Sequence, residues 1–153
     1  KMEEILEGIT SEAEIKKFEK VFVDQSAKGP PSHDAQFNYA WCLIRSRNQT
    51  NIKQAIPLLE DLFHKSQDDI AKRDYLFYLA VANCKLKDFD KALKYTDAIK
   101  QVEPKNHQAH QLEDYIRKKR RTDGLIGMAA VGGAAAFGIA AVGALVGLAI
   151  AKK

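Results

Sequence analysis

The sequence predicts an all-α protein: a six-helix bundle in which two tandem helix pairs are capped by N- and C-terminal helices, followed by one C-terminal transmembrane helix. Apolar residues recur at helical spacing through the first 124 residues, without the apolar and polar alternation of a half-buried strand. Part of this helical pattern occurs twice, and a long uncharged segment begins at Leu125. These three observations exclude a β-sheet protein and a disordered chain.

The helices can be located in order from their apolar faces and their ends. Residues 1–10 precede the first helix, which Ser11 and Glu14 open at the spacing of a capping box. Pro30 and Pro31 end that segment, because two successive prolines cannot continue a helix. Five more apolar helical faces follow, at residues 37–44, 52–63, 75–86, 89–102 and 109–116.

The four middle helices form an internal repeat of two helix pairs, over residues 34–66 and 70–104. The apolar pattern that begins at Phe37 returns at Tyr75, and Ala55 in the first half aligns with Ala92 in the second. Small residues at such positions let paired helices cross closely, as in a tetratricopeptide unit. Two repeats alone bury too little apolar surface, so the first and last helices are expected to cap the stack.

Stacked helix pairs of this kind have a concave face made by the first helix of each pair. We expect a groove there with an apolar floor and basic residues at one end, which suits an amphipathic helix or an extended apolar segment of a partner. The predicted groove residues are Tyr39, Leu43, Arg47, Phe77, Val81, Cys84 and Lys85. Tyr39 and Phe77 have an alternative interpretation as ordinary packing between helices, because aromatic residues at helical spacing commonly belong to a core.

The C-terminal segment predicts a tail anchor. Residues 125–151 contain no charged, amide or hydroxyl side chain, and about 20 apolar residues suffice to cross a bilayer. Residues 1–124 are then a cytosolic helical domain and residues 152–153 a short basic tail. Small-residue rows within the anchor would let two such helices associate as a homo-oligomer. The basic residues expected to aid membrane targeting are Arg117, Lys118, Lys119, Arg120, Arg121, Lys152 and Lys153.

Charge and composition narrow the function classes. All 20 acidic residues and all but two of the 24 basic ones precede residue 125, so the domain is nearly neutral and no nucleic-acid partner is expected. Cys42 and Cys84 lie in apolar helical patterns and predict reduced, buried or groove-lining thiols. His107 and His110 share a helical face without a third ligand. We therefore expect no enzyme, no metal site, no cofactor and no small-molecule substrate.

Four motifs carry a resemblance to a known family: Phe37-x-Tyr-Ala-Trp-Cys-Leu-Ile-Arg-Ser, Arg73-Asp-Tyr-x-Phe-Tyr-Leu-Ala-Val, Lys91-Ala-Leu-Lys-Tyr and Asp123-Gly-Leu-Ile-Gly-Met-Ala. With them, the chain resembles the mitochondrial fission 1 protein family over essentially its whole length. The resemblance implies a single-pass adaptor of the outer mitochondrial and peroxisomal membranes, with its N-terminal domain in the cytosol. Such an adaptor promotes fission of both organelles by recruiting a dynamin-related GTPase, directly or through other adaptor proteins.

The same resemblance assigns a regulatory role to the N-terminal arm. The arm corresponds to residues 2–10, and it would occupy or flank the groove through Ile5, Leu6 and Ile9. A partner would then have to displace these side chains to reach the apolar floor.

One function from another class stays open, a tail-anchored outer-membrane receptor for presequences or chaperones. Capture of a chaperone's C-terminal carboxylate requires Lys and Asn where Tyr39 and Leu43 stand. An apolar groove still accommodates an amphipathic presequence.

Overall fold

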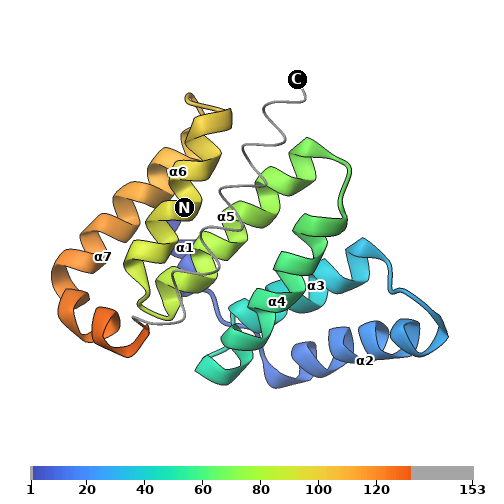
Figure 1. Ribbon diagram of the computed structural model, residues 1–153. Helices are drawn as coiled ribbons and strands as arrows, with labels where there is room; N and C mark the ends of the chain where they lie inside the picture. The colour runs from blue at the N-terminus through green and yellow to red at the C-terminus, as the bar shows by residue number, and fades with distance from the viewer. Residues whose placement is uncertain (1, 132–153) are drawn as a thin grey trace.

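The computed structural model describes the chain from residue 2 to residue 131, with side chains described up to Asp123. Within that part of the chain there are seven α-helices and no strand, which confirms the all-α, tetratricopeptide-like class (Figure 1). The helices are α1 (Met2–Glu7), α2 (Glu12–Lys28), α3 (His33–Ile44), α4 (Gln49–Lys65), α5 (Asp69–Lys85), α6 (Phe89–Val102) and α7 (His107–Val131). The expected count of six helices is corrected to seven, because part of the N-terminal arm folds into α1.

Side chains that cap the backbone fix where the helices begin. The Ser11 hydroxyl accepts a hydrogen bond from the backbone N–H of Glu14 at 3.2 Å, as the capping-box spacing predicts. Gly29 ends α2 with a φ of 147°, a backbone conformation that favours glycine. The side chains that cap the next four helices in the same way belong to Ser32, Asn48, Asp68 and Asp88.

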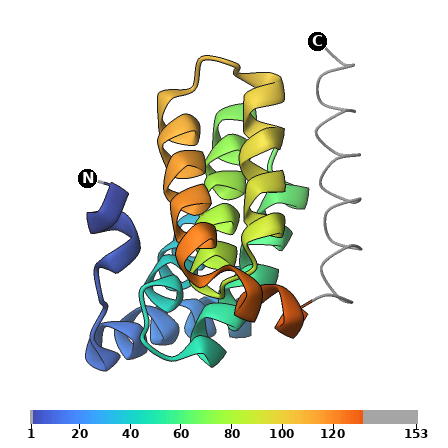
Figure 2. The same cartoon turned by 90° about the vertical axis from the view of Figure 1, so that its left-hand side faces the viewer.

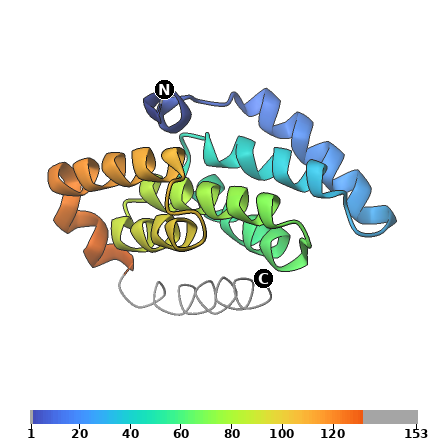
Figure 3. The ribbon, with the colours of Figure 1, turned by 90° about the horizontal axis from the view of Figure 1, so that it is seen from above.

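The helix pairs stack in two layers. Seen from above, α3, α5 and α7 lie in one layer and α4 and α6 in the other (Figure 3). The short helix α1 lies outside the α3, α5, α7 layer, on the side away from α4 and α6, and a second view agrees (Figures 2 and 3). The core between the layers is made by large buried side chains, among them Leu59, Leu79, Phe89, Tyr95, Ile99 and Ile116.

The first long helix, α2, is an end cap on this stack. It packs mainly against α3, and none of its side chains is fully buried. Its inward stripe of Ile15, Phe18 and Phe22 is partly buried against the core, whereas Val21 and Val23 remain exposed. This is the geometry of a terminal helix that covers a repeat on one face only.

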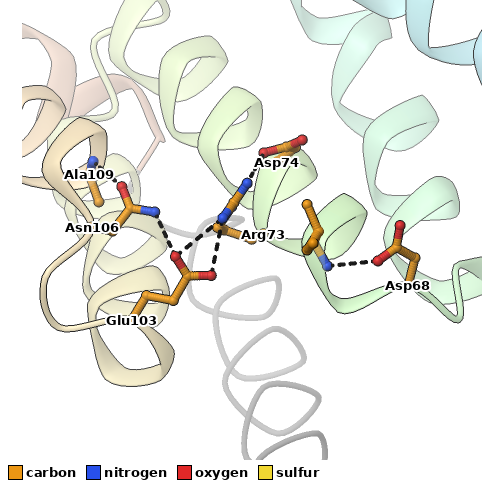
Figure 4. A network of polar contacts seen from close by, with 7 residues as sticks. Asp68, Arg73, Asp74, Glu103, Asn106 and Ala109 are labelled. Carbon is orange, nitrogen blue, oxygen red and sulfur yellow. Dashed lines mark hydrogen bonds and ion pairs between the residues drawn. The ribbon is translucent and has the colours of Figure 1, made fainter.

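A polar network at the other end holds α7 in place. The Arg73 guanidinium of α5 donates to both carboxylate oxygens of Glu103 at 3.3 Å, just after α6 (Figure 4). Glu103 also accepts from the Asn106 amide, and the Asn106 side-chain oxygen accepts from the backbone N–H of Ala109 in the first turn of α7 (Figure 4). The network therefore connects the start of α5 to the start of α7.

Candidate partner-binding face

A row of aromatic side chains joins α3 to α5. The ring of Tyr78 lies 5.1 Å from Phe37, 4.9 Å from Trp41 and 5.3 Å from Phe77, between centroids. All three contacts have tilted or edge-on geometries of the kind that stabilise aromatic pairs. Phe37, Trp41 and Tyr78 are only partly buried. We call these three residues the aromatic belt, because they leave apolar surface open on the α3, α5 layer.

Two basic residues lie at one end of the aromatic belt. Arg45 directly follows the last residue of α3, and its guanidinium lies 5.5 Å from the centre of the Trp41 ring. Lys85 follows Tyr78 by two turns on α5, and its Nζ donates to the backbone carbonyl of Ile44 at 2.6 Å. Burial lowers the pKa of Lys85, and the neighbouring charge of Arg45 lowers it further. Arg45 and Lys85 thus place positive charge beside apolar surface.

The N-terminal arm is seated at this basic end. Met2 is 8% exposed and Leu6 4% exposed, and both belong to the hydrophobic core of the domain. The backbone N–H of Thr10 donates to the Arg45 carbonyl at 3.0 Å, which fixes the end of the arm to the end of α3. The arm therefore lies beside the end of the α3, α5 face and leaves the aromatic belt partly open, while its regulation of partner binding stays a prediction.

Two open cavities flank the arm where it meets α7. One of about 230 Å³ lies beside Leu6 and is also lined by Cys84, Phe89 and Tyr115. The other, of about 470 Å³, lies beside Met2 and is lined on the α7 side by Gln111, Asp114, Tyr115 and Lys118. Tyr115 lines both cavities. The two cavities therefore belong to one furrow between α1 and α7, which α1 does not fill.

The predicted groove residues occupy different places in the structure. Tyr39, Leu43, Phe77, Val81 and Cys84 are at most 8% exposed, so they form no open floor. The Tyr39 ring packs against Phe22 of α2 at 5.2 Å, and its hydroxyl donates to Glu19 at 3.1 Å. Burial, and then this carboxylate, raise the pKa of Tyr39 to about 12. Any contact of these residues with a partner stays a prediction.

The two basic residues predicted for the groove lie in different places. Lys85 lies at the edge of the open face, while Arg47 is an exposed residue beyond the end of α3. The residues of this face that the sequence analysis did not predict are Phe37, Trp41, Arg45 and Tyr78. Their signal was the recurrence of apolar and basic residues four positions apart in Phe37, Trp41 and Arg45.

The arm uses a different set of contacts from the one expected. Leu6 is buried and Ile5 is half-buried, but Ile9 is 50% exposed and is corrected to a position outside the contact. Ile9 follows the end of α1, so it no longer shares the buried helical face. Met2 takes its place, because residues 2 and 6 of a helix point to one side.

Both cysteines are buried and form no disulfide with each other, and their burial agrees with the sequence analysis. Burial raises the pKa of the Cys84 thiol to about 12 and also raises that of Cys42. Thiols in this state are poor nucleophiles at neutral pH.

The basic residues of α7 are partly engaged within the domain. Arg117 pairs with Glu113 at 3.3 Å and Arg120 with Asp90 at 2.9 Å, while Lys119 lies 5.8 Å from the Tyr115 ring centre. Lys118 and Arg121 are exposed. No helix among the described residues is both long and apolar enough to cross a membrane. Most of the expected anchor over residues 125–151, together with Lys152 and Lys153, lies outside the described residues.

Comparisons with known proteins agree with this geometry. Residues 34–66 match the family model for the Fis1 N-terminal tetratricopeptide repeat, and residues 73–125 match that for the Fis1 C-terminal tetratricopeptide repeat. The chain is 47% identical to the mitochondrial fission 1 protein of Homo sapiens over 152 residues, which covers 99% of each. It is 39% identical to the FIS1-related protein fis-2 of Caenorhabditis elegans over 131 residues, or 86% of this chain and 87% of that protein.

Solved structures share the fold. The crystal structure of fission protein Fis1 from Saccharomyces cerevisiae superposes with a TM-score of 0.69 at 21% identity, covering 80% of this chain and 92% of that one. Yeast Fis1 in complex with an Mdv1 fragment containing N-terminal extension and coiled coil domains superposes with a TM-score of 0.70 at 22% identity, covering 78% and 92%.

Proposed function

The chain belongs to the mitochondrial fission 1 protein family, and on that basis we propose that it is a membrane-anchored adaptor that recruits the division machinery to mitochondria. In this proposal a dynamin-related GTPase arrives directly or through other adaptor proteins. The observation that carries it is the partly open aromatic belt beside Arg45 and Lys85. Aromatic and arginine side chains are the residue types that most often dominate protein–protein binding energy.

The relatives support the choice of partner class. Yeast Fis1 has been solved with a fragment of Mdv1, so a protein of this fold binds a second protein. We extend that to this chain as a proposal: an adaptor protein contacts the α3, α5 face. The ring surface of Tyr78 and Trp41 would supply apolar contact, and Arg45 would supply a charged anchor.

The cellular location belongs to the same proposal. Residues 125–151 would anchor the chain in the outer mitochondrial membrane and the peroxisomal membrane by a single pass, with the helical domain in the cytosol. The exposed Lys118 and Arg121 would face anionic headgroups at the membrane surface. Action in peroxisome division follows from that second location.

The test uses full-length chain in cells whose own family member has been deleted. Arg45→Glu and Tyr78→Ala, singly and together, should reduce the dynamin-related GTPase on mitochondria severalfold while the chain itself stays on the membrane. Lys94→Glu is the matched control, because Lys94 is an exposed residue of α6 in the other layer. Circular dichroism of each purified variant checks the fold. Recruitment that survives the double substitution would contradict a role for this face.

A further inference from the structure

The side chains of α1 indicate which kind of segment the surface beneath it can bind. In α1 the two buried side chains, Met2 and Leu6, are four residues apart and therefore lie on one side of the helix. The other residues of α1 include three glutamates, at positions 3, 4 and 7. The bound segment is thus a short helix with one apolar side and three exposed glutamates.

The seat of α1, by which we mean the residues outside the arm that line the two cavities, together with Arg45, has the complementary charge. Three lysines, Lys85, Lys87 and Lys119, line the cavity beside Leu6, and Glu7 of the arm lines it with them. Lys118 lines the second cavity together with Glu3. A Cβ atom placed on Gly8 would lie 3.1 Å from the Arg45 guanidinium, so that charge also adjoins the arm.

Acidic residues on the seat offset only part of this charge. Asp114 lines one cavity and Asp123 the other, where Asp123 lies 4.0 Å from Lys87. Five basic residues against two acidic ones leave an excess of three positive charges beside α1, and Glu3 and Glu7 of α1 line the same cavities. Opposite potentials of this kind select partners by charge and speed their encounter.

The arm is also built to be exchanged. A helix of six residues is not stable by itself in water, so α1 depends on its seat. The open cavities of about 230 and 470 Å³ on either side show that it covers the furrow incompletely. A longer helix with the same pattern would bury more of the furrow surface than α1 does.

We infer that the seat of α1 is a binding site for an acidic amphipathic helix of a partner, in which two apolar side chains four residues apart replace Met2 and Leu6. This inference rests on the proposed adaptor function and adds the chemistry of the segment that docks. It also predicts weak binding of basic amphipathic helices of the presequence type, because the positive charge of the seat repels them.

The test is a binding titration with the full-length chain in detergent micelles. The probe is a fluorescent, alanine-based helical peptide that contains Met-Glu-Glu-Ile-Leu-Glu, and its matched control has the three glutamates replaced by lysines. The chain carries Leu6→Ser, which loosens the arm without touching the seat. We expect the acidic peptide to bind at least about tenfold more tightly than the basic one, with the difference falling as salt is added.

Charge reversal of the seat provides the second measurement. Lys118→Glu with Lys119→Glu should remove most of the preference for the acidic peptide, whereas Lys53→Glu with Lys94→Glu, on exposed positions of the other layer, should leave it intact. In the chain with an intact arm, the acidic peptide should bind more weakly, since α1 competes. Equal or tighter binding of the basic peptide, or a preference that survives the Lys118 and Lys119 changes, would overturn the inference.

The two proposals fail in different ways. If neither peptide binds, but Arg45→Glu with Tyr78→Ala still abolishes recruitment in cells, the acidic-helix inference is wrong and the adaptor function stands. If the acidic peptide binds as expected while that double substitution leaves recruitment unchanged, the seat is real and the aromatic belt is not the recruiting surface.

Discussion

Lys85 of α5 donates a hydrogen bond from its Nζ to the carbonyl oxygen of Ile44, the last residue of α3, over 2.6 Å. The last carbonyls of a helix have no partner within the helix, so a side chain from elsewhere must satisfy them or water must. This bond therefore fixes the end of α3 against the end of α5. Both helices carry the aromatic belt, and Arg45 follows Ile44 directly.

Replacing Lys85 with methionine should lower the free energy of unfolding by about 1 kcal/mol, because the Ile44 carbonyl loses its donor. This loss of stability is limited because the variant no longer has to bury an ammonium group. Chemical denaturation followed by circular dichroism measures it. Lys65→Met is the control, since Lys65 makes only an exposed pair with Asp61, and it should change stability by less than about 0.5 kcal/mol. Equal effects of the two changes would argue against the capping role.

Two tyrosines with opposite surroundings offer a matched comparison. The Tyr95 hydroxyl is buried without a hydrogen-bond partner among the described residues, whereas the Tyr39 hydroxyl donates to Glu19 at 3.1 Å. Tyr95→Phe should leave stability unchanged or raise it by about 1 kcal/mol, and Tyr39→Phe should lower it by about 1 kcal/mol. Thermal unfolding of the two variants gives the sign, and a clear loss from Tyr95→Phe would contradict the prediction.

Gly8 controls how closely the arm can approach α3. A Cβ atom there would lie 2.9 Å from the Glu4 carbonyl oxygen and 3.1 Å from Arg45 Nη2, too close without a shift. Gly8→Ala should therefore loosen α1, seen as faster hydrogen exchange of residues 2–7 and about two- to tenfold tighter binding of a competing partner.

Ile9→Ala is the control for that measurement, because the half-exposed Ile9 side chain lies outside the buried contact. It should leave exchange in α1 unchanged. If Ile9→Ala loosens the arm as much as Gly8→Ala does, Ile9 contributes to the contact of the arm and the contact described for Met2 and Leu6 is wrong.

Glu113 makes stability depend on acid. Its carboxylate accepts from Lys100 Nζ at 2.7 Å, and this hydrogen bond, with help from Arg117, holds the pKa of Glu113 below its ordinary value. Because the folded-state pKa is depressed, the stabilisation is complete above the unfolded-state pKa of 4.5 and is lost as the pH falls through the folded-state value.

Glu113→Gln should therefore lower the free energy of unfolding by about 1 kcal/mol near pH 7, and the stabilities of the two chains should converge as the pH falls through the depressed folded-state pKa of Glu113. Urea titrations at several pH values measure the difference. Asp24→Asn removes the exposed Lys20–Asp24 pair and should give no comparable pH-dependent difference. A gap between the Glu113→Gln and unsubstituted chains that does not narrow in acid would rule out the assignment.

Local chemistry allowed much of the fold to be predicted. The capping box at Ser11 lies in the sequence itself, and the structure shows its hydrogen bond. The choice between Tyr39 and Trp41 could not be made in this way, because both are aromatic residues on apolar positions of one helix. Their roles depend on where α2 returns along α3: Phe22 and Glu19 meet Tyr39, and Tyr78 of α5 meets Trp41.

The arm shows a similar limit. Ile5, Leu6 and Ile9 are equivalent in the sequence because all three are apolar, but α1 ends at Glu7. Once the helix stops, only residues 2 and 6 share its buried side, and Gly8, which has no Cβ atom, lets the chain approach Arg45 closely. The end of a six-residue helix depends on tertiary contacts, so the sequence alone did not identify Met2.

The short connection between α1 and α2 has a consequence for dose and response. Because Thr10 is fixed to Arg45 a few residues from the seat, the exchange that we infer would have the arm compete at an effective concentration set by the tether, on the order of millimolar. That concentration does not change with how much of the protein a cell makes. A docking partner would therefore have to exceed a fixed threshold concentration, which single substitutions in the arm would shift and the expression level would not.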